Sequence, residues 1–301
     1  MDSTSQVESS PLLSIITINF NGLQDTCELI DSLYSYIKSV SFEIIVVDNA
    51  SNVNEADIIQ KRYTDVVVIR SEKNLGFSGG NNLGILKAKG SYLFLMNNDT
   101  FVLSDGFSAL IDEMQKNQSI AAASPKILFP GEGKKIQFAG YTPLTKVTLR
   151  NNIIGIGLED DGRWDTPSQT PIVHGSAMLF KKSAVEKVGL MPEVYFLYYE
   201  ELDWSASFIR AGYELWYLPY AVVYHKGSQS TGVQSPLQAY YMTRNRLLYA
   251  YRNLTGFEKW LSIIYQLTIA NAKAILLFLL RGEMAQSKAC MKGAYDYFKI
   301  K

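Results

Sequence analysis

The chain has 301 residues, 47% of them hydrophobic and 19% charged, which is enough apolar material to bury one large core or two modest ones. Its 29 basic residues equal its 29 acidic residues, and this balance argues against bulk binding of nucleic acid. The charge is uneven, however, because ten basic and only three acidic residues lie from Tyr240 onward. That tail therefore carries a net charge of +7, and the preceding 239 residues carry −7.

The first residues and the cysteines bear on where the protein works. Residues 1–11, MDSTSQVESSP, are acidic and polar and lack a basic region followed by an apolar one. They are typical of a disordered leader rather than of a signal peptide. Cys27 and Cys290 are the only cysteines, too few for a disulfide framework, and they fit a reducing compartment. Both features predict a cytoplasmic protein.

Strand-like apolar runs recur through the first half of the chain, with helix-length segments between them. The runs are LSIITI, FEIIVVD, DVVVIR, SYLFLMN and IAAASPKI, and the helical segments lie near 24–38, 54–63, 80–89 and 105–117. Continuous valine and isoleucine runs that alternate with helices are typical of a parallel sheet covered on both faces. We therefore predict an α/β fold with a mostly parallel central sheet.

Polar residues follow three of these strands, in TINFNG, VVDNAS and LMNNDT. Ligands of parallel sheets bind at the carboxyl ends of the strands, so these side chains should converge at one edge. LMNNDT places Asn97, Asn98 and Asp99 there, which suits either a polar turn or a metal site with oxygen ligands. Between the motifs lies NLGFSGGNNLG, whose glycines permit close backbone approach but which is neither G-x-G-x-x-G nor a Walker loop.

The second half of the chain is less regular. From 130 to 171 it is rich in glycine and proline, which predicts an insertion or lid. Strand character returns in PIVHGSAMLFKK, and a later helix should start near Glu200 and end at Gly212. Its first turn then holds three acids, Glu200, Glu201 and Asp203. The helix dipole alone could explain acids there, but three of them behind the aromatic stretch FLYY exceed what capping requires.

The longest apolar stretch, 260–280, is not expected to be a clean transmembrane helix. It is interrupted by three polar residues, Gln266, Asn271 and Lys273. Its apolar residues recur at helical spacing in one predicted stripe, and a second helical pattern flanked by lysines follows. We predict an amphipathic helical extension over 236–301. Residues 257–301 should contact either an anionic membrane surface or protein, in the latter case the catalytic domain or a second copy in a homo-oligomer.

Eight motifs in order make the chain recognisable. They are SIITINFNG, VVDNAS, KNLGFSGGNNLG, LMNNDT, GSAMLF, FLYYEELDW, RAGYELW and VVYHKGS. From about 13 to 232 the chain resembles the inverting nucleotide-sugar glycosyltransferases of family 2, most of all their bacterial rhamnosyltransferase-like branch. The resemblance implies a GT-A (Rossmann-like) fold over 12–235, with a donor half at about 12–125 and an acceptor half at about 126–235.

The resemblance assigns the donor site to the early motifs. Asp48 would accept hydrogen bonds from the pyrimidine base, with Asn19 and Asn49 nearby, although a strand-end turn also accounts for these residue types. The remaining donor pocket would be shaped by Asn74, Gly76, Gly79, Asn82 and Asn98. Helix capping near Asn81 is the alternative explanation for the asparagines of the glycine-rich stretch.

The resemblance also implies a metal site. In this family an Asp-x-Asp motif after the fourth strand holds a divalent ion against the donor's diphosphate. Here Asn97 replaces the first acid and Asp99 is retained, so Asp99 would supply most of the charge. His225 matches the family's third ligand, and its nitrogen suits Mn²⁺ rather better than Mg²⁺. His174 has no such support and is expected to be a pocket-wall or structural residue.

Inverting transfer needs a general base for the acceptor hydroxyl and electrostatic stabilisation of the departing nucleoside diphosphate. The second acid of the family's pair matches Glu201, which we expect to be the base. Glu200 would orient the acceptor or the base. Asp203 would bind the acceptor or support the site, and its place in the same turn leaves it open as an alternative base.

The implied donor is dTDP-L-rhamnose, with UDP-linked galactose, glucose or N-acetylglucosamine as alternatives. The acceptor would be a saccharide or a lipid-linked sugar of bacterial cell-surface polysaccharide, reached in the cytoplasm or at the inner face of the cell membrane. Two other classes of protein share some of these features. An NAD-dependent dehydrogenase is disfavoured because no G-x-G-x-x-G follows the first strand. A non-catalytic nucleotide-sugar-binding protein fits the weakened metal motif, but the retention of Asp99, Glu201 and His225 argues against it.

Overall fold

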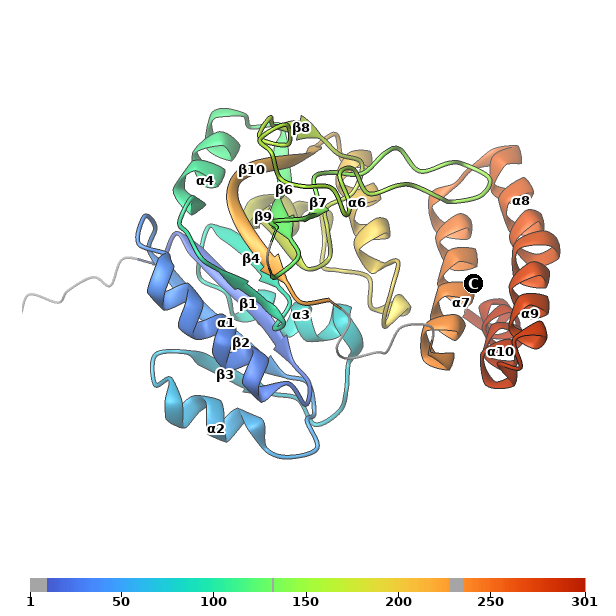
Figure 1. Cartoon of the computed structure of the whole chain (residues 1–301), viewed down its shortest axis with the longest axis horizontal. Coiled ribbons are helices and arrows are strands. Elements are labelled where there is room, and N and C mark those ends of the chain that lie inside the picture. The colour runs from blue at the N-terminus through green and yellow to red at the C-terminus, as the bar shows by residue number, and fades with distance from the viewer. Residues whose placement is uncertain (1–9, 132, 228–234, 301) are drawn as a thin grey trace, which may run out of the picture.

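A computed structural model describes residues 10–131, 133–227 and 235–300. Helices cover a central sheet, and a separate helical layer follows at the carboxyl end of the chain (Figure 1). Of the leader predicted over 1–11, all but Ser10 and Pro11 lies outside the described residues, as does the end of the motif match from 228 onward.

Strands and helices alternate through the first half of the chain, as the apolar runs predict. The strands are β1 (Leu13–Asn19), β2 (Phe42–Asp48), β3 (Val67–Arg70), β4 (Tyr92–Met96), β5 (Thr100–Val102), β6 (Ile120–Leu128), β7 (Ile136–Phe138), β8 (Ser168–Gln169), β9 (Ala177–Lys181) and β10 (Glu214–His225). The helices between them are α1 (Leu23–Tyr36), α2 (Glu55–Arg62), α3 (Gly76–Lys87), α4 (Phe107–Lys116), α5 (Lys182–Val188) and α6 (Glu200–Arg210), with a single 3₁₀ turn η1 (Glu193–Tyr195).

The strands form one sheet in the order β3-β2-β1-β4-β9-β6-β10-β5, with β7 beside β6 and β8 beside β10. Strands β1, β2, β3, β4, β6 and β10 share one direction, and the shorter β5, β7, β8 and β9 run against them. The predicted α/β fold with a mostly parallel sheet is therefore confirmed. Strand β9 was predicted within PIVHGSAMLFKK, but β5, β7 and β8 were not, because two or three residues carry too little periodicity to be read.

Neighbouring residues of the central strands enter different cores, because successive strand side chains point to opposite faces of the sheet. Ile15 and Val46 are buried with the apolar faces of α1 and α4. Ile16 and Ile45 are buried on the other face with α3, α5 and α6. Both faces are thus covered, which explains why these strands are continuous apolar runs.

The C-terminal layer contains α7 (Pro236–Asn253), α8 (Gly256–Tyr265), a π-helical turn η2 (Gln266–Ala270), α9 (Asn271–Leu280) and α10 (Met284–Ile300). Helix α10 packs closely on α7, and a Cβ atom at Gly293 would lie 2.5 Å from the carbonyl oxygen of Tyr240. A third apolar cluster joins α7, α8 and α10 to Leu149, Tyr195 and Tyr199 of the preceding part of the chain. The helical layer is therefore anchored on the rest of the protein.

Ser262 and Gln266 of the apolar helix Gly256–Leu280 point toward the protein. Ser262 Oγ donates a hydrogen bond to the carbonyl of Val147 (2.9 Å), and Gln266 Nε2 donates to the carbonyls of Val147 and Thr148 (3.2 Å each). Both side chains are fully buried. These hydrogen bonds tie the tip of the irregular segment, which was predicted as an insertion or lid, to α8 and η2. Figure 1 shows this segment as a long loop that reaches the helical layer.

The outward side of the same helix is apolar. We define the outer face as its exposed large apolar residues, Phe257, Trp260, Leu261, Ile264, Ile269, Leu276, Leu277, Leu279 and Leu280. By length and composition the 25 residues could cross a membrane, and only 17% of their most apolar window is buried. The predicted single stripe is wrong, because Ile263 packs in the third cluster while Trp260 and Ile264 are exposed.

Candidate active site

A cavity of about 280 Å³ opens at the carboxyl ends of β1, β2 and β4. Its polar lining includes Asn49 after β2, the stretch Asn97, Asn98 and Asp99 after β4, and His225 at the end of β10. The remaining wall is largely apolar and comes from α3, the segment before α6 and the start of α7. The polar strand ends thus meet at one edge of the sheet, because the strands that carry them share one direction.

Asn49 connects the end of β2 to the start of α3. Its Oδ1 accepts a hydrogen bond from the backbone N–H of Leu75 (2.9 Å), and its Nδ2 donates to Asn74 Oδ1 (3.1 Å) and to the carbonyl of Gly76 (3.0 Å). Asn74 Oδ1 also accepts from the backbone N–H of Gly76 (2.8 Å). Asn49, Asn74 and Gly76 all line the cavity, so this network fixes one wall of it.

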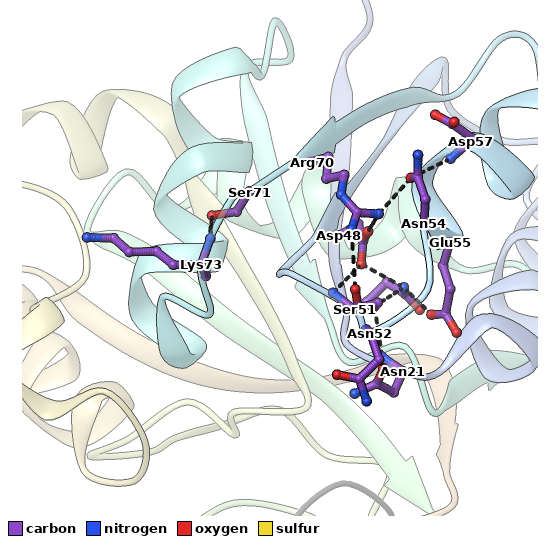
Figure 2. Close-up of polar contacts among 11 residues, drawn as sticks. Asn21, Asp48, Ser51, Asn52, Asn54, Glu55, Asp57, Arg70, Ser71 and Lys73 are labelled. Atoms are coloured by element: carbon purple, nitrogen blue, oxygen red, sulfur yellow. Dashed lines mark hydrogen bonds and ion pairs between the residues drawn. The ribbon is translucent and has the colours of Figure 1, made fainter.

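Asp48 lies beside this wall but does not line the cavity. Its carboxylate is fully buried and contacts Arg70 Nη1 (3.1 Å), Asn19 Nδ2 (3.3 Å) and the backbone N–H of Ser51 (3.2 Å), as Figure 2 shows for Arg70 and Ser51. Asn19 is also fully buried, and its Nδ2 lies 2.7 Å from Glu55 Oε2. Both residues, predicted to contact the donor, hold the strand ends together in this structure.

The glycine-rich stretch fits α3 against the segment that precedes α6. Gly76 has φ +70°, and a Cβ atom there would lie 2.2 Å from the carbonyl oxygen of Phe196. At Gly79 a Cβ atom would lie 2.7 Å from Leu75 Cβ. Asn82 Nδ2 donates to the carbonyl of Met191 (2.9 Å). Gly79 and Asn82 therefore support packing, while Gly76 also lines the cavity.

Asp99 and His225 form a close pair on the cavity wall. Asp99 Oδ1 and His225 Nε2 lie 3.2 Å apart without the alignment of a hydrogen bond, so Nε2 is buried without a hydrogen-bond partner among the described residues. His225 Nδ1 lies 2.7 Å from Gln137 Oε1, which fixes the ring with Nδ1 protonated and the Nε2 lone pair toward Asp99. Gln137, in β7, has no motif that could have identified it.

The two asparagines of this stretch have different surroundings. Asn98 Nδ2 donates to the carbonyl of Gly22 (3.3 Å) and to Thr26 Oγ1 (3.1 Å), which ties the loop to α1. The backbone N–H of Asn97 donates to the carbonyl of Ser176 (3.0 Å), and its side chain lines the cavity. Within the described ranges, no group of three His, Cys, Asp or Glu residues is arranged to hold a metal ion.

The acid pair Glu200 and Glu201 follows a segment in an unusual backbone conformation. Phe196, Tyr198 and Tyr199 have φ angles of 65°, 66° and 77°. A left-handed conformation in such residues costs about 1–3 kcal/mol each and persists only where the surroundings enforce it. The segment lines the cavity with Phe196 and Tyr198, so the acid pair starts α6 next to that wall.

Burial shifts the ionisation of both acids. It raises the pKa of Glu201 to about 7, and together with the charge of Glu201 it raises the pKa of Glu200 well above its usual range. Glu201 is half-buried beside the turn at Gly175, where a Cβ atom would lie 3.9 Å from its carboxyl carbon. His174, in the same turn, does not line the cavity, and its Nδ1 lies 2.9 Å from Ser176 Oγ. Burial and the neighbouring His225 lower its pKa to about 3.

Asp203 points to the C-terminal layer instead. Its carboxylate is fully buried, and Oδ2 lies 2.5 Å from Arg252 Nε of α7. Arg210 Nη2 lies 3.8 Å from Oδ1. Asp203 therefore joins α6 to α7 and is not among the residues that line the cavity.

A mostly parallel sheet covered by helices on both faces, with a polar cavity at its carboxyl edge, agrees with the GT-A fold of sugar transferases that the motifs imply. The model of the family "Glycosyl transferase family 2" matches residues 14–189, and the chain belongs to this family.

Relatives and a solved structure agree with this class. The chain is 28% identical over 255 residues to the low-salt glycan biosynthesis hexosyltransferase Agl10 of Haloferax volcanii, covering 82% of this chain and 78% of that protein. It is 25% identical over 210 residues to the N-acetylglucosaminyl-diphospho-decaprenol L-rhamnosyltransferase of Mycobacterium tuberculosis, covering 63% of this chain and 68% of that protein. The structure of GalNAc-T7 with UDP, GalNAc and Mn²⁺ matches with a TM-score of 0.62 and 17% identity over 89% of this chain, which spans only 58% of that one.

The Arg70–Asp48 pair yields a stability prediction. Arg70→Met leaves the buried Asp48 carboxylate without its cation, and the free energy of unfolding should fall by about 1–3 kcal/mol, less than for a fully buried pair because the Arg70 side chain is 38% exposed. Arg62→Met is the matched control, because the Arg62–Asp31 pair is half exposed and such pairs contribute about 0–1 kcal/mol. Urea unfolding followed by circular dichroism measures both. Equal losses would show that Asp48 does not depend on Arg70.

Proposed function

We propose that the protein is an inverting hexosyltransferase in which Glu201 deprotonates the acceptor hydroxyl. The observation that carries the proposal is a half-buried carboxylate with a pKa near 7 at the start of α6, beside the cavity wall. In the turn beside Glu201, the carbonyl of Ser176 accepts a hydrogen bond from the backbone N–H of Asn97, which lines the cavity. This one turn therefore lies between the proposed base and the donor cavity. A base of this pKa is partly ionised near neutral pH and still basic enough to accept a proton.

The residues on the cavity wall fit a divalent cation. Asp99 offers a carboxylate oxygen, His225 offers a buried Nε2 lone pair, and Asn97 offers an amide oxygen. Gln137 orients His225 as outer-shell partners of metal-bound histidines do. We propose Mn²⁺ or Mg²⁺ there, and GalNAc-T7 was solved with Mn²⁺. When bound, the ion supplies positive charge that stabilises the departing diphosphate.

For the donor we propose dTDP-L-rhamnose, with UDP-galactose, UDP-glucose and UDP-N-acetylglucosamine as alternatives. The similarity to an L-rhamnosyltransferase supports this choice. Because Asp48 is already paired with Arg70 and does not line the cavity, we assign the contact to the pyrimidine base to Asn49. Asn74, Gly76 and Asn98 line the rest of the donor cavity, and Asp48 supports it from behind.

A nucleotide-sugar-binding protein without catalysis is the competing function. It would share the cavity and the cation pair, but it would not need an acid pair with raised pKa values beside them. A dehydrogenase is disfavoured by the glycine-rich stretch, which packs on the segment before α6 rather than following β1. Release of nucleoside diphosphate that depends on an acceptor separates transfer from binding.

Glu201→Gln keeps the shape of the side chain but cannot accept the proton. Turnover should fall roughly 10²-fold or more, while donor affinity stays near that of the wild type. Glu186→Gln, an exposed acid of α5, is the matched control. Near-normal turnover in Glu201→Gln would move the assignment to Glu200 or Asp203.

The pH profile adds an independent reading of the same base. Protonation removes the base, so kcat/KM of the wild type should fall as the pH drops through about 7 and should level off above it. This acid limb should be missing from the residual activity of Glu201→Gln. An acid limb that persists in the variant belongs to another group.

Metal dependence is tested by removing the metal and by substituting the proposed ligands and Gln137, which orients His225. Treatment with EDTA should abolish transfer, Asp99→Asn should abolish Mn²⁺ binding, and Asn97→Asp should preserve activity. Gln137→Leu frees the His225 ring and should weaken Mn²⁺ binding about 10–100-fold, as other outer-shell losses do. Electron paramagnetic resonance of free Mn²⁺ measures the affinity, and Gln169→Leu on the exposed β8 is the control. Full activity after EDTA would leave Asn97 and Asp99 as a turn that contacts the diphosphate directly.

We propose that the outer face docks on the anionic inner surface of the cell membrane, where a lipid-linked sugar of cell-surface polysaccharide would be the acceptor. Exposed cations accompany the apolar residues, among them Lys273, Arg281 and Lys288. Cations near such a surface contribute on the order of 1 kcal/mol each, which adds to burial of the apolar side chains in lipid. Two buried, unpaired cysteines fit the reducing side of that membrane.

Vesicle sedimentation tests this docking. The full chain should bind phosphatidylglycerol vesicles at low salt, bind phosphatidylcholine vesicles less, and lose binding in the double variant Trp260→Glu, Leu276→Glu. Leu86→Glu, an equally exposed leucine of α3, is the control and should bind like the wild type. If the wild type stays in the supernatant as a dimer that the double variant converts to monomers, the outer face is instead a contact between two copies.

A further inference from the structure

We propose that helix α7 belongs to the catalytic apparatus, because Asn245 and Arg244 hold the segment 194–199 and thereby position the acid pair Glu200 and Glu201. This inference rests on the proposed function, since it names positioning residues for the same reaction. It would make the C-terminal layer part of the active site and not only a surface for docking.

Asn245 is the centre of this contact. It is fully buried, and its Nδ2 donates to the carbonyls of Tyr195 (3.0 Å), Leu197 (2.7 Å) and Tyr198 (2.8 Å). An amide nitrogen carries two hydrogens, so three carbonyls converge on a single donor group. Such convergence fixes the path of the backbone between Tyr195 and Tyr198, where no strand or α-helix pairs these groups.

Arg244 completes the contact from the next position of α7. Its Nη2 donates to the carbonyls of Val194 (3.0 Å) and Tyr195 (2.6 Å). Its Nε donates to Asn245 Oδ1 (2.8 Å), which sets the amide with its nitrogen toward the segment. The guanidinium also lies 4.8 Å from the ring centroid of Tyr241, and that ring stacks on Phe196 at 5.3 Å.

Two further contacts continue the same face of α7 toward the acids. Arg246 Nε lies 2.7 Å from the hydroxyl of Tyr199, the residue directly before Glu200. Arg252 pairs with the buried Asp203 in the first turn of α6. Helix α7 thus contacts the chain on both sides of the acid pair, and the other side of the segment rests on α3 through the carbonyl of Phe196 and the N–H of Phe77 (2.7 Å).

The segment needs such support because its conformation is not self-sustaining. Left-handed Phe196, Tyr198 and Tyr199 would relax to extended or right-handed conformations if the carbonyls of Val194, Tyr195, Leu197 and Tyr198 lost these donors. A change in the backbone at Tyr199 would displace the first turn of α6 and with it Glu201. Misplacement of a reacting group by about 1 Å can lower the rate about 10²-fold.

The test uses Asn245→Asp in the full chain. The variant keeps the size of the side chain but replaces the donor group by an oxygen that faces three carbonyls. Asn253→Asp is the matched control, because Asn253 lies on the same helix and its Oδ1 accepts from Arg210, which an aspartate can also do. Arg244→Met is the second variant, which removes two of the carbonyl contacts without placing a charge in the core.

Hydrogen exchange followed by mass spectrometry, donor affinity and turnover are measured together. We expect faster exchange confined to 194–203 in Asn245→Asp, kcat lowered about 10–100-fold, and a donor dissociation constant changed much less. A looser segment should also admit water to Glu201, whose pKa is raised by burial. The acid limb of the pH profile should therefore move to lower pH. Arg244→Met should show the same changes to a smaller extent, and Asn253→Asp should resemble the wild type.

The outcomes separate this inference from the proposed function. Unchanged exchange in both Asn245→Asp and Arg244→Met would overturn the contact as a constraint on the segment. Faster exchange with normal turnover and a normal pH profile would show that the constraint does not position the base. If Asn245→Asp does not fold, Arg244→Met decides alone. If the wild type transfers no sugar, the proposed function fails, and the exchange data still decide whether α7 holds the segment.

Discussion

The site depends on the hydrogen bonds by which α3 and α7 hold the six residues 194–199. The segment 194–199 makes no strand, and its carbonyl groups are paired with donors from the neighbouring helices. Helix α3 supplies one donor at Phe77, and α7 supplies the amide of Asn245 and the guanidinium of Arg244. The glycine at position 76 is needed for the same reason, since any Cβ there would collide with the carbonyl of Phe196. The positions of the cavity wall and of the acid pair therefore depend on the contacts that hold this one segment.

The sequence predicted what depends on nearby residues. Apolar periodicity identified the parallel strands and their helices, and the acids at the start of α6 could be read from a helix boundary. The sequence could not show that the Asp48 carboxylate is already paired with a cation, because its partner Arg70 lies 22 residues further along the chain. Gln137 lies 88 residues from the histidine it orients, and Asn245 lies 50 residues from Tyr195. Neither Gln137 nor Asn245 lies in a recognisable motif.

The C-terminal helices show why a periodic pattern does not tell which side faces water. In an ordinary surface helix the polar residues are exposed and the apolar residues are buried. Helix α8 and η2 depart from this arrangement, because Ser262 and Gln266 are buried and donate to the carbonyls of Val147 and Thr148. Ile263 is also buried, but the apolar residues of the outer face are exposed, and they are too many to be scattered surface positions. The same helix thereby holds the tip of the insertion.

The long separation between Asn245 and the carbonyls it binds has a consequence for biosynthesis. A growing chain emerges from the ribosome from its N-terminus, and the sheet with most of the cavity lining has been made once β10 is complete, before Leu237 of α7. The acid pair is then present, but the helix that fixes it has not yet been translated. If Asn245 and Arg244 position the acid pair as we propose, the nascent chain forms most of the cavity before the acid pair is held in place. Transfer activity would then begin only once α7 has been made, close to the moment when the apolar helices that follow also emerge.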